Sequence, residues 1–401
     1  MGIALVSLKI IPTTAKALFQ LTPLRKRPFR VIGYTKNVFV FSDNTGRNMP
    51  SPSQFIPPFI IASSLLLGAC GGSSTSTTTT ASGDATDITD VNLTSRSGSC
   101  EDYVGSYESS VTDIQKGVSF MGDFTISVSG TTCTLASNNI PNHNFNDATA
   151  DFANDTAEVA KSYTMPTSPS AAGSTTELAL GTTNAILLNG VVLDILPAAC
   201  YGVGQPGQTL GQEKTECGGD QIDNPWRYDP MSSLNDFGTD IHNAHVQPDG
   251  TYHYHGNPIA LFAQDCATAT TTSPVIGFAA DGFPVFGSCI DDGNDGVRQV
   301  TSSYALKAGA RQAVSGYTTP AGGTGDIASD NYDGQFRGDY EYTASSGDLD
   351  ECNGMTVDGQ YGYFVTSTFP WMINCYKGTV QSSFSARNTQ ELEVMMHGHS
   401  H

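Results

Sequence analysis

The sequence predicts a mainly β fold, namely a disulfide-linked, sandwich-like domain with long loops. Short segments in which apolar and polar residues alternate recur along the chain, as in half-buried strands. Several of these segments are joined by Asn-Gly or Asp-Gly, which are strong hairpin signals. Long helical periodicity is absent from the sequence. Once Cys70 is set aside, eight cysteines remain at long spacings without a CxxC pair, which predicts four disulfides of open connectivity.

The predicted elements follow in order. Residues 84–165 form an N-terminal β-rich region with a strand at 124–129 and a short helix near 150–161. The main predicted domain covers residues 166–380, and residues 381–401 form a C-terminal tail. Within the main domain, strands are expected at 185–196 (a hairpin around Asn189-Gly190), 252–255, 275–287 (a hairpin around Asp281-Gly282) and 361–366.

An internal duplication is also predicted. The segment that starts Asp249-Gly-Thr and contains Tyr252 and Tyr254 aligns with a second segment at an offset of 109 residues. Asp, Gly, both Tyr and a later Cys match in register, which favours a repeated unit over chance. His253 and His255 of the first copy become Gly and Phe in the second, so these imidazoles belong to the first copy alone.

Charge and composition narrow the classes of function. The 401 residues carry 19 Lys and Arg against 39 Asp and Glu, a formal net charge of −20. Such an acidic chain argues against a nucleic-acid partner, because nucleic-acid binding needs a basic face. It favours cations instead. With only 14% charged residues, the sequence also argues against a helical bundle or coiled coil.

The first seventy residues resemble a targeting segment. Residues 55–69 form an apolar run that is too short for a membrane span and suits the core of a signal peptide. The run ends in Leu-Gly-Ala-Cys70, which resembles the bacterial lipobox, where the signal is cleaved before the Cys and the Cys is acylated. We therefore predict a signal peptide at 49–69, lipidation at Cys70 and a Ser/Thr-rich tether at 70–83.

These features predict a location in the cell envelope, with the lipid anchor holding the protein to a membrane, facing the periplasm or the outer surface. Residues 1–48 carry eight of the basic residues and a single acid, and they are interpreted as a misannotated upstream extension. Eight paired cysteines agree with an exported protein, since disulfides persist in oxidising compartments.

A histidine cluster carries the candidate chemistry. His242, His245, His253 and His255 lie within fourteen residues. His253 and His255 are two apart on a predicted strand and share a face, so both imidazoles can reach one ion. The Pro-Asp-Gly turn between the two pairs would bring them together. Imidazole sets suit Cu or Zn, so we predict a transition-metal site at these four residues, with a structural hydrogen-bonding network as the alternative.

Five further residues are candidates for orienting the ligands. Asp240 and Asp249 lie close to the histidines in sequence and could accept hydrogen bonds from their rings. Tyr252 and Tyr254 are predicted on the opposite face of the strand. Asp281 is a more distant carboxylate that a catalytic cleft would have to join to the cluster.

The segment Tyr252-His253-Tyr254-His255 after Pro-Asp-Gly-Thr is the motif that names the YHYH domain proteins, and the sequence resembles that family over roughly 165–380. The blocks that also match are Asn189-Gly190, Pro225-Trp226, Asp281-Gly282-Phe283-Pro284 and Cys352-Asn353-Gly354. The resemblance implies an exported protein, often a lipoprotein, and implies little about activity. Many relatives have His where this chain has Met355 and Gly362.

Two weaker metal signals remain. His397, His399 and His401 alternate in the tail, a pattern that chelates Cu²⁺, Ni²⁺ or Zn²⁺ and forms a secondary cluster. The acidic turns at 291–296 and 330–334 resemble Ca²⁺ loops in part, but both lack the Glu at the twelfth position, so plain turns are the alternative to a Ca site.

Three functions stay open at this point. The first is an exported lipoprotein that binds a transition metal through its clustered histidines. The second is a metal-free surface module for binding or adhesion, with an unknown protein or glycan partner. The third is a metal-dependent extracellular hydrolase or oxidase. The catalytic residues, and whether the protein is an enzyme, are left open by the sequence.

Overall fold

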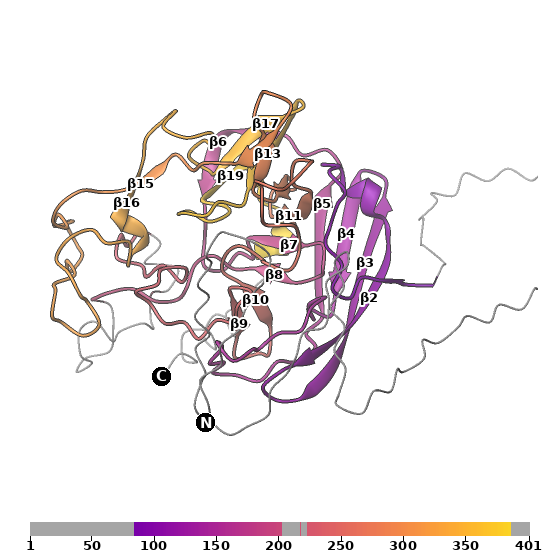
Figure 1. Ribbon diagram of the computed structural model, residues 1–401, viewed down its shortest axis with the longest axis horizontal. Coiled ribbons are helices and arrows are strands. Elements are labelled where there is room, and N and C mark those ends of the chain that lie inside the picture. Colours follow the sequence, from indigo (N-terminus) through magenta and orange to yellow (C-terminus); the bar gives the residue numbers. More distant parts are fainter. Residues whose placement is uncertain (1–83, 203–216, 218–222, 386–401) are drawn as a thin grey trace, which may run out of the picture. The chain divides into compact units, whose positions relative to one another are not determined.

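The computed structural model describes residues 84–202, 217 and 223–385, and this part of the chain is mainly β (Figure 1). Its helical segments are three 3₁₀ turns: η1 (Cys100–Tyr103), η3 (Arg337–Asp339) and η4 (Ser382–Ser385). The predicted fold class is therefore confirmed. A search of the described residues found no helix with the length and apolar character needed to span a membrane. The predicted signal peptide, Cys70, the tether and the histidines of the tail lie outside the described residues.

The first sheet has five strands in sequential order: β1 (Thr86–Asp87), β2 (Gly105–Asp113), β3 (Val118–Ser129), β4 (Thr132–Ser137) and β5 (Lys161–Pro166). In β3 the residues from Gly122 to Ser127 alternate between buried and more exposed positions, and Phe124 and Ile126 point into the core. This is the period of two that the sequence predicts for residues 124–129.

The predicted helix near 150–161 is wrong. Residues 151–160 have no regular structure, and β5 begins at Lys161. The reason is tertiary hydrogen bonding: the Ala157 N–H donates to the Gly250 carbonyl at 3.0 Å, and the Asn154 amide donates to the Val246 carbonyl at 3.2 Å. The segment is thus bonded to the turn that precedes the Tyr-His-Tyr-His motif instead of to its own backbone.

The second sheet has eight strands in the order β17-β18-β12-β11-β7-β8-β10-β9. Its first four strands along the chain are β7 (Ala185–Leu187), β8 (Val192–Leu193), β9 (Ala244–Val246) and β10 (Tyr252–Tyr254). The other four are β11 (Val275–Ala279), β12 (Pro284–Phe286), β17 (Gly354–Val357) and β18 (Gln360–Phe364). All the strands predicted in the main domain are among them, and Gly190 and Gly282 have the positive φ that tight hairpin turns require.

The order of this sheet is that of a duplicated unit. Each half consists of two antiparallel hairpins, and the last strand of each half pairs in parallel with the second strand: β10 with β8, and β18 with β12. The halves meet through the antiparallel pair β7 and β11. From the centre of the sheet outward, the second half has the order β11-β12-β18-β17, which repeats the order β7-β8-β10-β9 of the first half. This agrees with the predicted internal duplication.

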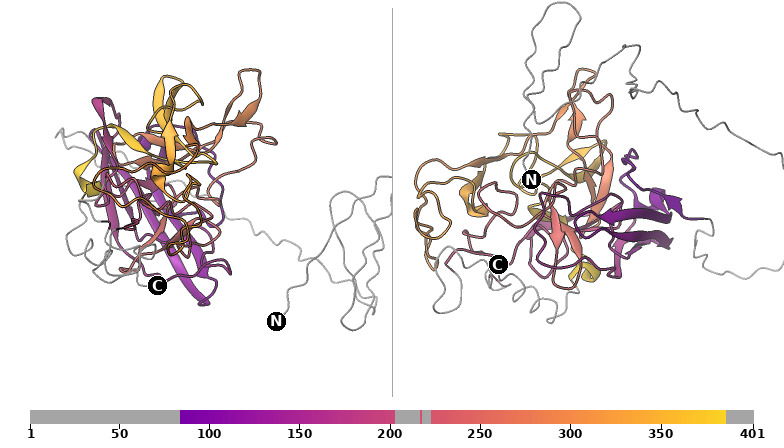
Figure 2. Two further views of the ribbon diagram at one scale, coloured as in Figure 1. Left: turned by 90° about the vertical axis from the view of Figure 1, so that its left-hand side faces the viewer. Right: turned by 60° about the horizontal axis from the view of Figure 1, so that its bottom comes forward.

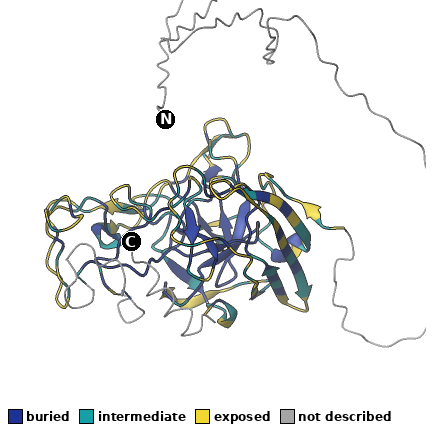
Figure 3. Cartoon of the chain, turned by 90° about the horizontal axis from the view of Figure 1, so that it is seen from below, coloured by how far each residue is buried: buried dark blue, intermediate teal, exposed yellow. Residues whose placement is uncertain are grey.

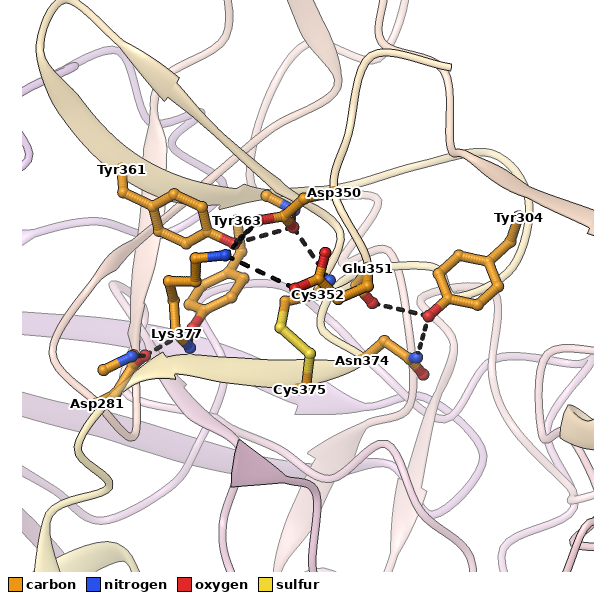
Figure 4. The surroundings of a disulfide bond; sticks show 12 residues. Asp281, Tyr304, Asp350, Glu351, Cys352, Tyr361, Tyr363, Asn374, Cys375 and Lys377 are labelled. Atoms are coloured by element: carbon orange, nitrogen blue, oxygen red, sulfur yellow. Dashed lines mark hydrogen bonds and ion pairs between the residues drawn. A yellow bond between two sulfur atoms is a disulfide. The ribbon is translucent and has the colours of Figure 1, made fainter. Parts of the chain in front are cut away.

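Local hydrogen bonds repeat between the halves as well. Asp240 Oδ1 accepts from the N–H of His242 and Ala244, and Asp350 Oδ1 accepts from the N–H of the residues at the same two offsets. The Tyr252 hydroxyl donates to Asp240, and the Tyr361 hydroxyl donates to Asp350 (Figure 4). The two halves thus share one turn-and-tyrosine motif, with different side chains on the opposite strand face.

One hydrophobic core joins the first sheet to the second, and the two lie side by side in Figure 1 and in the right-hand view of Figure 2. In the second sheet the strands from β7 to β12 are buried, whereas β17 and the start of β18 are partly exposed. The first sheet keeps one face partly in solvent (Figure 3). The remaining strands form three two-stranded pairs: β6 (Ala171–Glu177) with β19 (Cys375–Gly378), β13 (Cys289–Asp291) with β14 (Val297–Gln299), and β15 (Tyr304–Leu306) with β16 (Tyr340–Tyr342).

Four disulfides link the chain, as the cysteine count predicts. The pairs are Cys100–Cys133, Cys200–Cys217, Cys266–Cys289 and Cys352–Cys375. A second, smaller core of aromatic residues lies around Trp226 and Phe336. Beside it the Arg311 guanidinium is fully buried and pairs with Asp339 at 2.8 Å and with Asp333. The loops of the second half are therefore fixed by covalent and ionic links as well as by packing.

Candidate metal centre

A tight hairpin positions the candidate ligands. β9 and β10 pair antiparallel, with His245 directly opposite His253. The turn between them is closed by the Gly250 N–H, which donates to the Gln247 carbonyl at 2.9 Å, and Gly250 takes a φ of +91°. That conformation favours glycine because a Cβ atom would be strained there. The turn thus places a histidine from each strand, and His255 just beyond β10, on the same face.

Three imidazoles converge on that face, and we call His245, His253 and His255 the histidine triad. Nε2 of His255 lies 3.1 Å from Nε2 of His253 and 3.0 Å from Nε2 of His245. One ring nitrogen from each of the three lies within 4.8 Å of the others, and all three residues are buried. Two ligands on a tetrahedral Zn²⁺ are separated by about 3.3 Å when each bond is close to 2.05 Å. The spacing of the ring nitrogens is close to this value.

Backbone carbonyls orient two of the rings. His245 Nδ1 lies 2.6 Å from the Phe237 carbonyl, and His253 Nδ1 lies 3.2 Å from the Thr251 carbonyl. A carbonyl only accepts, so each Nδ1 carries the proton and each Nε2 presents a lone pair. This is the arrangement in which imidazole ligates a metal ion, with the second ring nitrogen donating to a carbonyl. The triad therefore has a donor set and an orientation that fit a transition-metal ion.

The other face of β10 contacts the first sheet, as the alternation predicts. Tyr252 and Tyr254 are fully buried there, with their rings 5.6 Å apart. The Tyr252 hydroxyl donates to Asp240 at 2.8 Å, and the Tyr254 hydroxyl lies 2.6 Å from His143 Nε2 and accepts from the Asn189 amide at 3.0 Å. Burial raises the pKa of both tyrosines, so both remain neutral.

His242 is not brought to the triad. Its ring packs against that of His143, with the ring centroids 3.9 Å apart and the planes tilted by 37°. Asn243 has a φ of +62° and reverses the chain, while Asp240 holds the N–H of His242 in the same turn, so His242 lies before β9 and off its triad face. Burial lowers the pKa of His242 and raises that of Asp240.

The sequence interpretation missed His143. Burial, with a smaller repulsion from His242, lowers its pKa to about 3, so the ring is neutral at physiological pH. It comes from the loop between β4 and β5, about a hundred residues before the other histidines. Nothing in the local sequence around it signals the contact.

The remaining orienting candidates lie elsewhere. Asp249 caps its own turn by accepting from the Thr251 N–H and hydroxyl, both at 2.9 Å. Asp281 accepts from the Tyr363 hydroxyl at 2.6 Å and from the Gly378 N–H at 2.8 Å, within the second half of the sheet (Figure 4). Burial raises the pKa of Asp281. Asp240 reaches the histidine cluster through Tyr252 and the backbone, and not through a ring of the triad.

The second half of the sheet has no counterpart of the triad. Met355 and Gly362 are opposite each other in β17 and β18, in the same register as His245 and His253. Phe364 takes the position of His255 and stacks on Phe286, with ring centroids 5.0 Å apart. A Cβ atom at Gly362 would lie 2.5 Å from the Phe286 ring. Apolar packing thus fills the space where the first half holds imidazoles.

The acidic turns bind their own backbone. Asp292 Oδ1 accepts from the N–H of Asn294 and Gly296, and Asp330 Oδ1 accepts from the Gly322 N–H. Among the residues that the structure describes, the triad is the group of three or more histidine, cysteine or carboxylate side chains that converge closely enough to hold an ion. Calcium at these turns stays a prediction.

The fold and site therefore define a disulfide-linked β protein with a duplicated sheet and a buried cluster of three imidazoles in one half. The family model described as YHYH protein matches residues 162–378, more than half of the chain. The chain belongs to the YHYH protein family, and the expected resemblance is confirmed. Neither the search of curated proteins nor the search of solved structures gave a match.

Proposed function

We propose that this protein is a transition-metal-binding protein of the cell envelope, and that the histidine triad holds one Cu²⁺ or Zn²⁺ ion. The observation that carries the proposal is the convergence of three ring nitrogens, with Nε2 atoms 3.0 and 3.1 Å apart in two of the pairs. Imidazole nitrogens that present lone pairs at this spacing are typical ligands of one transition-metal ion. A cation satisfies all three at once.

The alternative function, a metal-free surface module that presents the Tyr-His strand to a partner, receives less support. All three residues of β10 are buried, and so are the three histidines of the triad. A small ion fits such a site better than a macromolecular partner does, because only an ion reaches side chains that are shielded from solvent.

The metal content of the purified full chain tests the proposal. We expect close to one Cu or Zn per chain by elemental mass spectrometry, after purification without metal-affinity resin. Replacing the triad with the residues of the second half (His245→Met, His253→Gly and His255→Phe) should abolish binding. His242→Asn is the matched control, because this half-buried histidine lies outside the triad, and it should keep the metal. A chain that lacks the last seven residues separates the triad from the tail.

A spectroscopic measurement decides the case if the triple variant does not fold. Cu²⁺ added to the wild-type chain should show, by electron paramagnetic resonance, hyperfine coupling to imidazole nitrogens that survives removal of the tail. A wild-type chain that is folded and still metal-free after Cu²⁺ and Zn²⁺ are offered would refute the proposal.

A metal-dependent hydrolase or oxidase is the second candidate, and the number of ligands favours it. Three protein ligands leave one position of a tetrahedral ion for water or a small molecule, whereas purely structural zinc sites usually have four protein ligands. Azide added to the Cu²⁺-loaded protein tests for that open position. A new charge-transfer absorption band supports it, and an unchanged spectrum contradicts it.

The location in the cell envelope is part of the proposal. Four disulfides support an oxidising compartment, and the Leu-Gly-Ala-Cys70 segment supports lipid attachment. Cells grown with an alkyne-labelled fatty acid should incorporate the label into the wild-type protein and not into Cys70→Ser. Equal labelling of the two proteins would contradict lipidation at Cys70.

A further inference from the structure

A cavity of about 380 Å³ lies among the loops of residues 162–378, which match the family model, and the histidine triad does not line it. Its lining includes residues of β6, β15, β16, η3 and the loop at 223–227. The side chains that matter for a ligand are a guanidinium and three aromatic rings. Tyr304, Tyr340 and Phe369 form what we call the aromatic wall, and Arg337 lies against it.

Arg337 is a cation that forms no ion pair with the residues that the structure describes. Its Nη2 donates to the Asn374 side-chain oxygen at 2.7 Å, and its Nη1 is buried with no hydrogen-bond partner. Asp229 attracts the guanidinium, but its carboxylate accepts from the Trp371 indole at 2.9 and 3.1 Å, and no ion pair of Arg337 forms within the described chain. Buried cations in proteins are normally paired, because leaving water without a partner is costly.

A second guanidinium increases the positive charge at the cavity. Arg227 lines it as well, is 2% exposed, and donates through Nη1 to the carbonyls of Pro197 and Cys217. Burial, with repulsion from Arg337, lowers the pKa of Arg227 to about 10. Arg227 therefore still carries a positive charge at neutral pH, beside that of Arg337. The two carboxylates of the lining, Glu177 and Asp223, are exposed and screened by water.

The aromatic wall provides an apolar surface next to the charge. Tyr340 and Phe369 stack with their ring centroids 4.4 Å apart, and Tyr304 meets Phe369 edge to face at 5.3 Å. The Tyr304 hydroxyl donates to the Glu351 carbonyl and accepts from the Asn374 amide (Figure 4). Asn374, which also accepts from Arg337, therefore helps to fix the aromatic wall. Rigid, pre-organised walls of this kind reduce the entropy that a ligand loses on binding.

We propose that this cavity binds a small ring-bearing carboxylate, whose carboxylate pairs with Arg337 and whose ring contacts the aromatic wall. A planar guanidinium matches a carboxylate with two parallel hydrogen bonds, and Nη1 has no hydrogen-bond partner among the described residues. An aromatic acid and a sugar acid share this chemistry. The volume of the cavity suits a single ring of either kind.

Calorimetric titration of the full chain distinguishes the two sources. Benzoate and glucuronate are the probes, and benzamide and glucose are the neutral analogues of similar size. We expect one of the two acids to bind at least about tenfold more tightly than its neutral analogue, because the charge-assisted pair is lost in the analogue. The identity of that acid assigns the ring as aromatic or sugar. Equal binding of acid and analogue, or no binding of either acid at about 10 mM, would overturn the proposal.

Two variants place the binding in this cavity. Arg337→Gln removes the cation, and Asn374→Asp puts a carboxylate on its Nη2 while keeping the shape of the side chain. Each should weaken binding of the acid by at least about tenfold. Arg298→Gln is the control, since Arg298 pairs with Asp348 at the surface, and it should bind like the wild type. If Arg337→Gln does not fold, the comparison of acid binding between Asn374→Asp and the wild type tests the assignment to this cavity. Wild-type affinity in folded Asn374→Asp would overturn the assignment to this cavity.

Discussion

Acidification should destabilise the protein through His143, and the effect can be calculated. His143 is 3% exposed, and burial with repulsion from His242 lowers its pKa to about 3 in the folded state. In the unfolded chain the pKa is near 6.5. Between these two values the unfolded state binds a proton that the folded state excludes. The stability that neutral His143 contributes is therefore complete above pH 6.5 and is lost as the pH falls toward 3.

The magnitude follows from the two pKa values. Between pH 7 and pH 5 the unfolded His143 becomes almost fully protonated while the folded one stays neutral, which lowers the free energy of unfolding by about 2 kcal/mol. Asp229, Asp240 and Asp281 act in the opposite direction, because burial raises the pKa of each and protonation then favours the folded state. These groups are the same in wild type and variant, so a comparison of the two isolates His143.

Urea unfolding of the metal-free protein at pH 7 and pH 5 measures the effect. We expect the wild type to lose about 2 kcal/mol more than His143→Gln over this interval. Gln is chosen because it keeps a polar contact with the Tyr254 hydroxyl. Measurements at pH 7 and pH 9 serve as the control, where the difference should vanish because both states of His143 are neutral. Equal pH dependence of wild type and variant between pH 7 and pH 5 would refute the reasoning.

Three further predictions concern stability. In urea unfolding, Tyr252→Phe should lower the free energy of unfolding by about 2 kcal/mol and Tyr361→Phe by about 1 kcal/mol. The reason is that the same hydroxyl–carboxylate bond is fully buried only in the first half of the sheet. Equal losses in the two variants would contradict this. Asp339→Asn removes the negative charge that pairs with the buried Arg311 guanidinium and should cost about 3 kcal/mol in the same assay. Asp348→Asn at the surface should cost below about 1 kcal/mol. Removing the metal by chelation should lower the midpoint of thermal unfolding. The loss corresponds to about 4 kcal/mol relative to protein in which the free metal concentration is a thousandfold above Kd. An unchanged midpoint would count against the triad as a metal site.

The parts of the fold that depend on neighbouring residues could be predicted from the sequence. The hairpins around Asn189-Gly190 and Asp281-Gly282 are fixed by two-residue turns, and the structure has them as β7–β8 and β11–β12. His253 and His255 share a face because strand side chains alternate. His245 joins them because the Pro-Asp-Gly turn sets the register of β9 against β10.

The parts that depend on distant residues could not be predicted. His143 reaches Tyr254 and His242 only because the two sheets share a core, and no other histidine lies near it in the sequence. The place of His242 depends on the positive φ of Asn243, which the sequence does not indicate. The predicted helix near 150–161 failed for the same reason, since its backbone groups find partners across the fold.

The duplication supplies an internal comparison for the triad. The second half builds the same hairpins, the same parallel pairing and the same tyrosine–aspartate bond with Met355, Gly362 and Phe364 in place of the three histidines. The architecture of the sheet therefore does not require imidazoles at these positions. Burying three of them also costs more desolvation than burying the apolar Phe286–Phe364 stack. Binding of the proposed transition-metal ion would offset this cost, because three imidazoles at this spacing are ligands for such an ion and the apolar stack is not.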